Sequence, residues 1–420
     1  MEILGERFGS LSVACRLAPS EPAYILDVAC QPAGGPLVAA SCSDGTVRLH
    51  QRHTLAPHGA GFKGHAGPLC GVRFAQSSPD TLYSGSTDGT LRCWDARQPG
   101  GTATRVFRSD ASHVFCCMDL SCNDMLLCGG TEQVGEDSFL VFWDVRMATS
   151  SSSTSSSSSS TSTFSTAAGK QQGLLGVYSE SHSDDITAVR FHPRQADRVA
   201  SGGTDGLVNV FQLNMGAEED ALTHTCNTHS SAASLAWAGS DYNELLCVTH
   251  DEGLCLWDVR HSDSDSDDPL ALLSVPDART HVSLPPAPQS DALEYLVGGA
   301  WMEEAGQLLV VGGAGSGALH LIGCCGREGL RPLRCLEGGH SATVRCFLWL
   351  PLEGALLTGG EDGQLLLWRQ GGAETQACEK KALEGVSELQ GGRKDTLKSV
   401  SSLQLKARSH RKHHSNSKHH

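Results

Sequence analysis

Histidine and aspartate residues recur at fixed distances from an aromatic residue, and this pairing is the first candidate for chemistry. His65 lies 29 residues before Trp94, and His340 lies 28 residues before Trp368, each with an Asp in between. A histidine beside a carboxylate can act as a general base or take part in metal binding. An enzyme site is usually built once, however, and this combination is repeated along the chain. We therefore expect structural residues and predict no catalytic site, no cofactor, no metal and no enzyme.

The combination belongs to a longer repeated phrase. It reads SGSTDGTLRCWD at 84–95, SGGTDGLVNVFQ at 201–212, VTHDEGLCLWDV at 248–259 and TGGEDGQLLLWR at 358–369, with weaker copies at 41–50, 135–144 and 311–322. The seven copies align on one slot, which is filled in turn by His50, Trp94, Trp143, Phe211, Trp257, Ile322 and Trp368. Most intervals between these residues are 44–49 residues, and the two longer ones, of 68 and 65, each contain an insertion. A period of this length indicates a repeat architecture.

Each copy predicts the same local structure. A short apolar run is a strand, Asp-Gly is a tight turn, and the alternating residues that follow form the next strand. A further strand precedes each copy, such as CGVRFA at 70–75. Four strands per unit, seven units and no long helix predict an all-β, seven-bladed propeller of four-stranded antiparallel blades. The strand SLSVACRL at 10–17 would complete the last blade and close the ring.

This pattern resembles the WD40 repeat family, in which the His, a strand Ser or Thr, the turn Asp and the Trp form one hydrogen-bonded chain. The resemblance implies such four-residue chains in three blades, the second, the fourth and the last. In the fourth blade Phe211 replaces the Trp, which weakens that network. The residues are, in turn, His65, Ser84, Asp88 and Trp94; His182, Ser201 and Asp205; and His340, Thr358, Asp362 and Trp368. His113 and His229 occupy the corresponding place in two further units.

The resemblance also implies a function, a scaffold or adaptor that joins other proteins in an intracellular complex. In the family, the residue before the turn Asp faces the wide opening of the propeller. Here these residues are Thr87, Glu136, Thr204, His250 and Glu361, with Ser43 by analogy. Together with Asp184 and Asp185 they make the opening acidic to neutral. We expect either a site for a basic peptide segment or a merely solvated rim.

Three copies end in W-D-x-R, at Arg97, Arg146 and Arg260. This motif is similar to the box found in substrate receptors of cullin-4 ubiquitin ligases, so the three arginines are candidate contacts for the ligase adaptor. The alternative interpretation is that W-D-x-R is a common ending of such repeats.

Composition sets the domain boundaries and excludes several classes of partner. We assign 1–372 to the propeller, with a Ser-rich insertion at about 148–172 and an acidic, Pro-rich insertion at about 261–290, and 373–420 to a mostly disordered tail that is basic and His-rich at its end. The net charge is −15, and because residues 393–420 are basic, the propeller is more acidic still. An acidic body repels phosphates, so nucleic acid is an unlikely partner except through the tail.

The cysteines and the hydropathy pattern suggest a compartment. The 17 cysteines are scattered, many within apolar runs, which favours reduced thiols in the cytoplasm or nucleus. We expect no signal peptide, no membrane span and a chain that is monomeric by itself.

Overall fold

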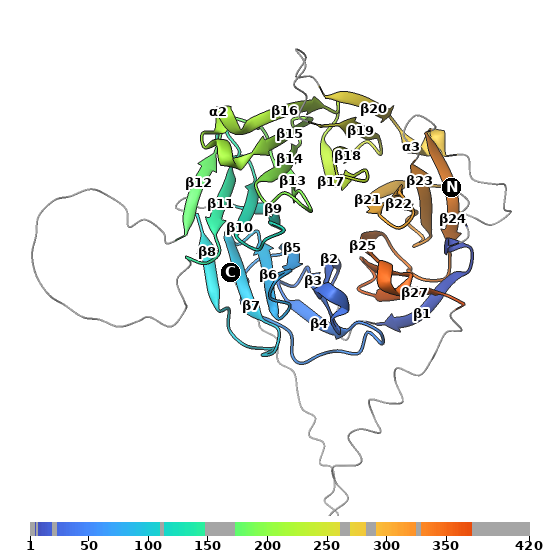
Figure 1. Ribbon diagram of the computed structural model, residues 1–420. Helices are drawn as coiled ribbons and strands as arrows, with labels where there is room; N and C mark the ends of the chain where they lie inside the picture. Colours follow the sequence, from blue (N-terminus) through green and yellow to red (C-terminus); the bar gives the residue numbers. More distant parts are fainter. Residues whose placement is uncertain are drawn as a thin grey trace, which may run out of the picture. The chain divides into compact units, whose positions relative to one another are not determined.

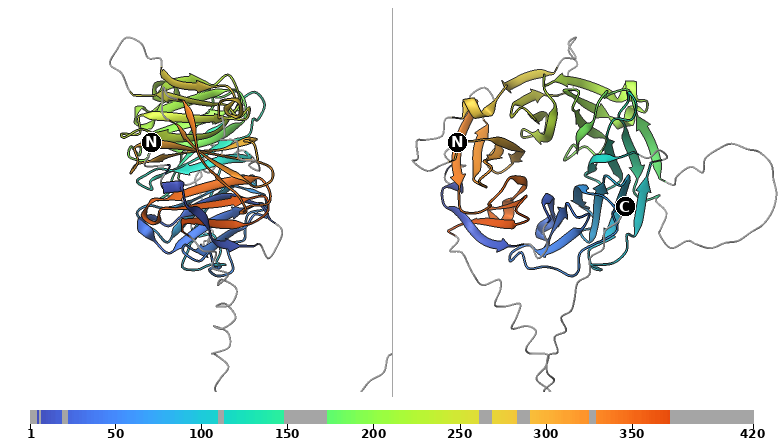
Figure 2. Two further views of the ribbon diagram at one scale, coloured as in Figure 1. Left: turned by 90° about the vertical axis from the view of Figure 1, so that its right-hand side faces the viewer. Right: turned by 180° about the vertical axis from the view of Figure 1, so that it is seen from behind.

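The computed structural model describes residues 5, 7–18, 23–109, 113–147, 173–260, 269–282, 291–324 and 329–371. These residues form seven antiparallel sheets arranged as blades around a central channel (Figures 1 and 2). The predicted all-β, seven-bladed fold is therefore confirmed.

The innermost strand of each blade contacts the innermost strands of both neighbouring blades, so these strands form a closed ring. They are β2 (Ile25–Cys30), β5 (Leu69–Phe74), β9 (Phe115–Leu120), β13 (Ile186–Phe191), β17 (Ala232–Ala238), β21 (Tyr295–Met302) and β25 (Val344–Leu350).

The second and third strands lie progressively further out. The second strands are β3 (Leu37–Cys42), β6 (Thr81–Ser86), β10 (Leu126–Thr131), β14 (Arg198–Gly203), β18 (Glu244–Thr249), β22 (Gln307–Gly313) and β26 (Ala355–Gly360). The third strands are β4 (Val47–Gln51), β7 (Thr90–Asp95), β11 (Leu140–Asp144), β15 (Leu207–Gln212), β19 (Leu254–Asp258), β23 (Leu319–Cys324) and β27 (Leu365–Gln370).

Six blades have a fourth, outer strand, and the first blade replaces it with two isolated bridges. The outer strands are β8 (Arg105–Arg108), β12 (Leu174–Tyr178), β16 (Leu222–Asn227), β20 (Leu270–Val275), β24 (Leu330–Leu336) and β1 (Leu11–Leu17). In the first blade, Val47 bridges to Phe62 and His50 bridges to Pro57. The connections carry short helical turns at η1 (Pro32–Gly34), η2 (Leu213–Met215), α2 (Glu218–Ala221), α3 (Ala278–His281) and η4 (Pro351–Glu353).

The ring is closed by the beginning of the chain. Strand β1 pairs antiparallel with β27 over Leu11–Leu17 and Leu365–Gln370, as the sequence predicts. Figure 1 shows β1 as the outer strand of the blade that contains β27. Phe8 and Leu11 are buried there with Trp368, in one apolar cluster that extends into the sixth blade. The seventh blade is therefore complete only with residues from both ends of the propeller.

The tight turns between the second and third strands explain why Asp-Gly recurs. Gly45, Gly89, Gly206 and Gly363 follow the turn Asp with φ between +69° and +79°, a region that side chains with a Cβ rarely adopt. A Cβ added at Gly89 would also lie 2.8 Å from the carbonyl oxygen of His113 in the next blade. Each such turn therefore requires glycine for its backbone and, at Gly89, for the close approach of the next blade.

One predicted insertion was too broad. Residues 270–275 lie inside the stretch assigned as an acidic, Pro-rich insertion, but they form β20, which pairs with β19. The apolar sequence LALLSV follows the Asp-rich run directly, so its strand character was hidden by its neighbours. The Ser-rich insertion at 148–172 and the tail at 373–420 lie outside the described residues.

Candidate functional site

Four side chains of the second blade form one hydrogen-bonded chain. His65 Nε2 lies 2.8 Å from Ser84 Oγ, and Trp94 Nε1 donates to the same hydroxyl at 2.8 Å. On the other side of the imidazole, His65 Nδ1 lies 3.0 Å from Asp88 Oδ2. The Asp also accepts from the backbone N–H of Ala66, which ties the turn to the loop that carries the histidine.

The last blade repeats this arrangement. His340 Nε2 lies 2.8 Å from Thr358 Oγ1, which accepts from Trp368 Nε1 at 2.9 Å, and His340 Nδ1 lies 3.0 Å from Asp362.

In the fourth blade, where Phe211 replaces the Trp, the strand hydroxyl loses the indole donor, and a different polar residue contacts the histidine itself. His182 is 2.7 Å from Ser201 and 3.0 Å from Asp205. The amide of Asn209 lies 3.3 Å from His182 Nε2 and donates to the Ser181 carbonyl. Sequence reasoning missed Asn209, although it is a polar residue inside an otherwise apolar strand.

His113 and His229 do not form such chains. His113 stacks on Phe139 with ring centroids 4.5 Å apart and contacts Ser109. Within the described residues, the indole N–H of Trp143 in the same blade has no partner. His229 is exposed, with a backbone φ of +60°. A histidine at the expected spacing is thus insufficient where the turn of the blade differs.

Burial keeps His50 and His65 neutral at pH 7. It lowers the pKa of His65 to about 4, although Asp88 favours the protonated ring, and it lowers the pKa of His50 to about 4 as well. Burial opposes ionisation of Asp88, but hydrogen bonds from Thr90, Ala66 and His65 hold its pKa below the usual value. At pH 7 the second blade therefore pairs a neutral imidazole with a carboxylate. This is a structural arrangement, and no metal-binding group of three or more His, Cys, Asp or Glu occurs among the described residues.

A recurring backbone hydrogen bond defines the rim of the channel. In six blades, the residue after the second strand donates its N–H to a carbonyl just before the innermost strand, at 2.8–3.1 Å. We call these the rim residues: Ser43, Thr87, Glu132, Thr204, His250 and Glu361. All but one of them are the candidates from the sequence.

The exception is Glu136, which lies in the same connection but is not the residue that makes the rim hydrogen bond. The β10–β11 connection is longer than the other turns, so Glu132 makes the rim hydrogen bond, to Val114. Glu136 lies further along the connection, exposed, beside the Val134–Asp137 bridge. Aligning the copies on the aromatic slot hid this difference, because the extra residues precede that slot.

The rim carries a group of carboxylates above the third and fourth blades. We call it the acidic rim cluster: Glu132, Glu136, Asp137, Asp184 and Asp185. Asp185 accepts from the N–H of Gln133 at 2.8 Å, which holds the two loops together. None of the five forms an ion pair with a described residue, whereas Glu361 pairs with Arg345. Besides burial, the charges of Glu132 and Asp185 help to raise the pKa of Cys116 to about 12.

The three W-D-x-R arginines lie at the opposite ends of their blades, because each follows the end of a third strand. Each donates its backbone N–H and its Nε to the preceding Asp, at 2.9–3.1 Å. The side chains of Arg97, Arg146 and Arg260 are 70%, 63% and 69% exposed. The structure therefore gives all three the same conformation and leaves their guanidinium groups accessible.

Comparison with known proteins agrees with this geometry. The family model "WD domain, G-beta repeat" matches residues 58–95, 173–212 and 330–369, which include the three hydrogen-bonded chains. The chain contains WD40 repeats. The matched segments end with the third strand of the second, fourth and seventh blades of the WD40 propeller.

Relatives match most of the WD40 propeller. The WD repeat-containing protein GTS1 of Arabidopsis thaliana is 27% identical over 79% of this chain and 78% of its own length. The WD repeat-containing protein 89 homolog of Dictyostelium discoideum is 23% identical over 82% of each chain. An uncharacterised WD repeat-containing protein of Saccharomyces cerevisiae is 25% identical over 46% of this chain. WD40 propellers are in general platforms on which other proteins bind.

None of the helices that the structure describes is long and apolar enough to span a bilayer.

The hydrogen-bonded chains lead to a first prediction about stability. Replacing Ser84 with Val removes the partner of both His65 and Trp94 and leaves two buried polar atoms unpaired, which should cost about 3 kcal/mol. Replacing Ser201 with Val should cost about 1 kcal/mol, because Asn209 still contacts His182. Urea unfolding of the two variants measures the difference. Equal losses of stability would contradict the assignment.

Burial of neutral histidines leads to a second prediction. In the folded protein the pKa values of His50 and His65 are about 4, below the ordinary histidine value of 6.5. As the pH falls from 6.5 toward 4, these two histidines therefore bind protons in the unfolded chain but not yet in the folded protein. The free energy of unfolding should then fall by about 2 kcal/mol for each of the two histidines between pH 7 and pH 5. His50→Phe should reduce this loss by one histidine's share in urea unfolding, whereas the exposed His229→Asn should leave it unchanged. A pH-independent stability would refute the account.

Proposed function

We propose that this protein is a non-catalytic scaffold that binds a basic segment of a partner protein across the acidic rim cluster. The observation that carries the proposal is that two hydrogen-bonded loops hold five carboxylates, none of which pairs with a cation from the described residues. Three of the five are exposed and two are half-buried. Carboxylates in contact with water cost little to leave unpaired, so they remain available for a cationic partner. Lys and Arg side chains of a partner would gain attraction from several carboxylates at once.

The arrangement of the loops supports this binding mode. The Gln133 side chain donates to the Ser183 carbonyl at 2.6 Å, while its backbone N–H donates to Asp185. These two bonds connect the loop of the third blade to that of the fourth. A surface fixed in this way loses little conformational freedom on binding, which favours affinity.

A charge-reversal experiment tests the proposal. Glu132→Lys combined with Glu136→Lys should weaken binding of Lys- and Arg-rich peptides, or of a partner purified with the wild-type protein, by about tenfold. The affinity of the wild type should also fall with rising salt concentration. The matched control is Glu219→Lys with Asp220→Lys, two exposed acids in α2 on the outside of the fourth blade. Unchanged binding by the rim variant would refute the assignment.

A second candidate function is that of a substrate receptor for a cullin-4 ubiquitin ligase. It is favoured by the shared, exposed conformation of Arg97, Arg146 and Arg260 at one end of their blades. An adaptor protein could contact several of these guanidinium groups together.

This candidate has its own test. Changing all three arginines to Ala should abolish co-precipitation with the ligase adaptor and leave binding at the acidic rim cluster intact. Arg279 is the control, since it forms the same local pair with Asp277 but lies outside the W-D-x-R motifs. If the intact protein does not bind the adaptor, or if the triple variant binds equally well, the ligase role is excluded.

The remaining expectations stay predictions. A location in the cytoplasm or nucleus rests on cysteines that serve as small apolar residues in the core, such as Cys128 and Cys247. The monomeric state and the weak affinity for nucleic acid rest on the acidic charge of the propeller.

A further inference from the structure

The central channel contains a cavity of about 630 Å³ whose two sides differ in chemistry. One side is formed by the first four blades and carries charged residues, among them Asp27, Arg73 and Arg190. The other side is formed by the last three blades and is mostly apolar, with Leu235, Trp301 and Leu348 among its residues. A volume of this size is typical of sites that bind small molecules.

Most of the charges in the channel are paired. Arg73 donates from Nη1 to Asp27 at 2.6 Å and from Nε to Asp119 at 2.8 Å, so one guanidinium joins carboxylates of two neighbouring blades. The second oxygen of Asp119 accepts the N–H of Phe191 in the fourth blade. These contacts use both carboxylates and leave little capacity for another cation.

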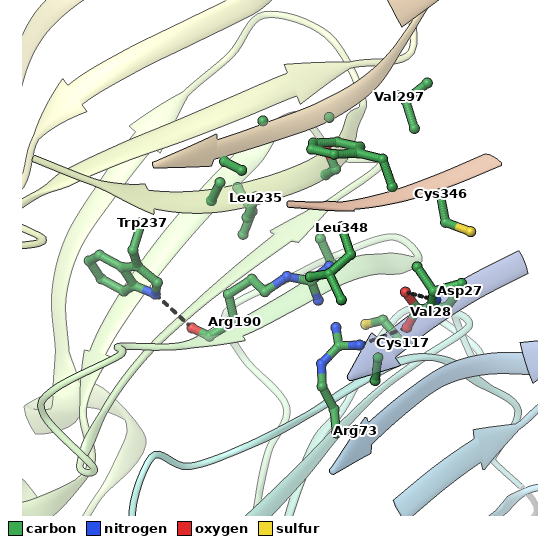
Figure 3. Close-up of a pocket in the computed structure, with 18 of the residues that line it drawn as sticks. Asp27, Val28, Arg73, Cys117, Arg190, Leu235, Trp237, Val297, Cys346 and Leu348 are labelled. Carbon is green, nitrogen blue, oxygen red and sulfur yellow. Dashed lines mark hydrogen bonds and ion pairs between the residues drawn. The ribbon is translucent and has the colours of Figure 1, made fainter. Parts of the chain in front are cut away.

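Arg190 is the exception. Its guanidinium donates to the carbonyl of the preceding residue, Val189, at 2.9 Å, and it forms no ion pair with a carboxylate among the described residues. Burial and the neighbouring charge of Arg73 lower its pKa. Figure 3 shows its side chain extending into the cavity toward Arg73 and Leu348. The backbone of Arg190 is fixed by Trp237, whose indole N–H donates to the Arg190 carbonyl at 3.1 Å.

Arg190 is half-buried in the channel and has no carboxylate paired with it among the described residues. Leaving a partly buried guanidinium unpaired is costly, and an oxyanion would offset that cost. The planar guanidinium matches carboxylate and phosphate oxygens in two parallel hydrogen bonds. The apolar wall opposite would contact a flat or aliphatic group. We propose that the channel binds a small organic oxyanion, a carboxylate or phosphate with an apolar body, through Arg190.

This site is independent of the acidic rim cluster, which attracts the opposite charge. Asp27 and Asp119 also face Arg190, but their oxygens are already taken by Arg73 and by backbone N–H groups. Arg73 and Arg345 also line the cavity, but each already pairs with a carboxylate. An incoming anion therefore meets Arg190 as the arginine without a paired carboxylate. Sequence reasoning missed this residue, although an Arg inside the apolar strand TAVRFHP was a visible signal.

Calorimetric titration of the full chain with phenyl phosphate, benzoate, inorganic phosphate and uncharged phenol tests the proposal. We expect phenyl phosphate or benzoate to bind more tightly than inorganic phosphate or phenol, because each contacts both walls of the channel. The stronger of the two identifies the anionic group. Arg190→Gln should weaken this binding by about tenfold or more. Arg279→Gln, which removes an exposed arginine elsewhere, should leave it unchanged.

A second variant keeps Arg190 and tests the same site in case Arg190→Gln does not fold. Leu348→Glu would place a carboxylate on the opposite wall and compete with the ligand for Arg190, so it should also weaken binding. Circular dichroism and unfolding curves would show that each variant is folded. The proposal is overturned if the wild type binds none of the anions, if phenol binds as tightly, or if folded Arg190→Gln and Leu348→Glu both bind like the wild type.

Discussion

Pairing between β1 and β27 is the constraint on which the rest of the propeller depends. A blade has two apolar faces and cannot bury them without a neighbour on each side. An open row of blades would therefore expose one face at each end and an unpaired strand edge. Because Leu11–Leu17 pairs with Leu365–Gln370, the last blade contains both ends of the folded chain, and no blade is terminal. The channel, the rim and the opposite face, where the W-D-x-R arginines lie, form only when the ring is closed.

Polar contacts then fix how neighbouring blades meet. Within the second, fourth and seventh blades, a buried histidine connects the tight turn to the loop before the innermost strand. Between blades, Arg73 joins Asp27 and Asp119, and Asp119 reaches Phe191, so the first four blades share one network. The channel wall of the last three blades is mostly apolar, and its one charged lining residue, Arg345, pairs with Glu361. This asymmetry gives the channel a charged side and an apolar side, and the same half of the ring carries the acidic rim cluster.

The sequence predicted the fold almost completely, because the propeller repeats its local signals. Alternating apolar residues, Asp-Gly turns and the aromatic slot are each visible in a single strand pair, and seven copies reinforce one another. The prediction was wrong in two places where the local sequence pattern of a strand was weak or irregular. Strand β20 was lost beside an Asp-rich run, and the first blade has bridges at Pro57 and Phe62 in place of an outer strand.

The functional surfaces were less predictable than the fold. The lengthened connection in the third blade gives the rim hydrogen bond to Glu132 instead of Glu136, and nothing in the aligned phrases distinguishes extra residues in a loop from a shifted turn. Contacts between blades, such as those of Arg73, join residues 46 positions apart in different repeats. Such pairs depend on how the blades are oriented, which no single repeat encodes. The sequence therefore showed an arginine at position 190 within an apolar strand, but it could not show that this arginine faces the channel without a paired carboxylate.

Amide hydrogen exchange measured by mass spectrometry tests the closed ring most directly, since it needs no substitution. Strand β1 should exchange as slowly as β26 and β27, because all three would open only when the ring itself opens. Rapid exchange of residues 11–17, with 355–370 still protected, would mean that the chain's first strand does not hold the propeller together.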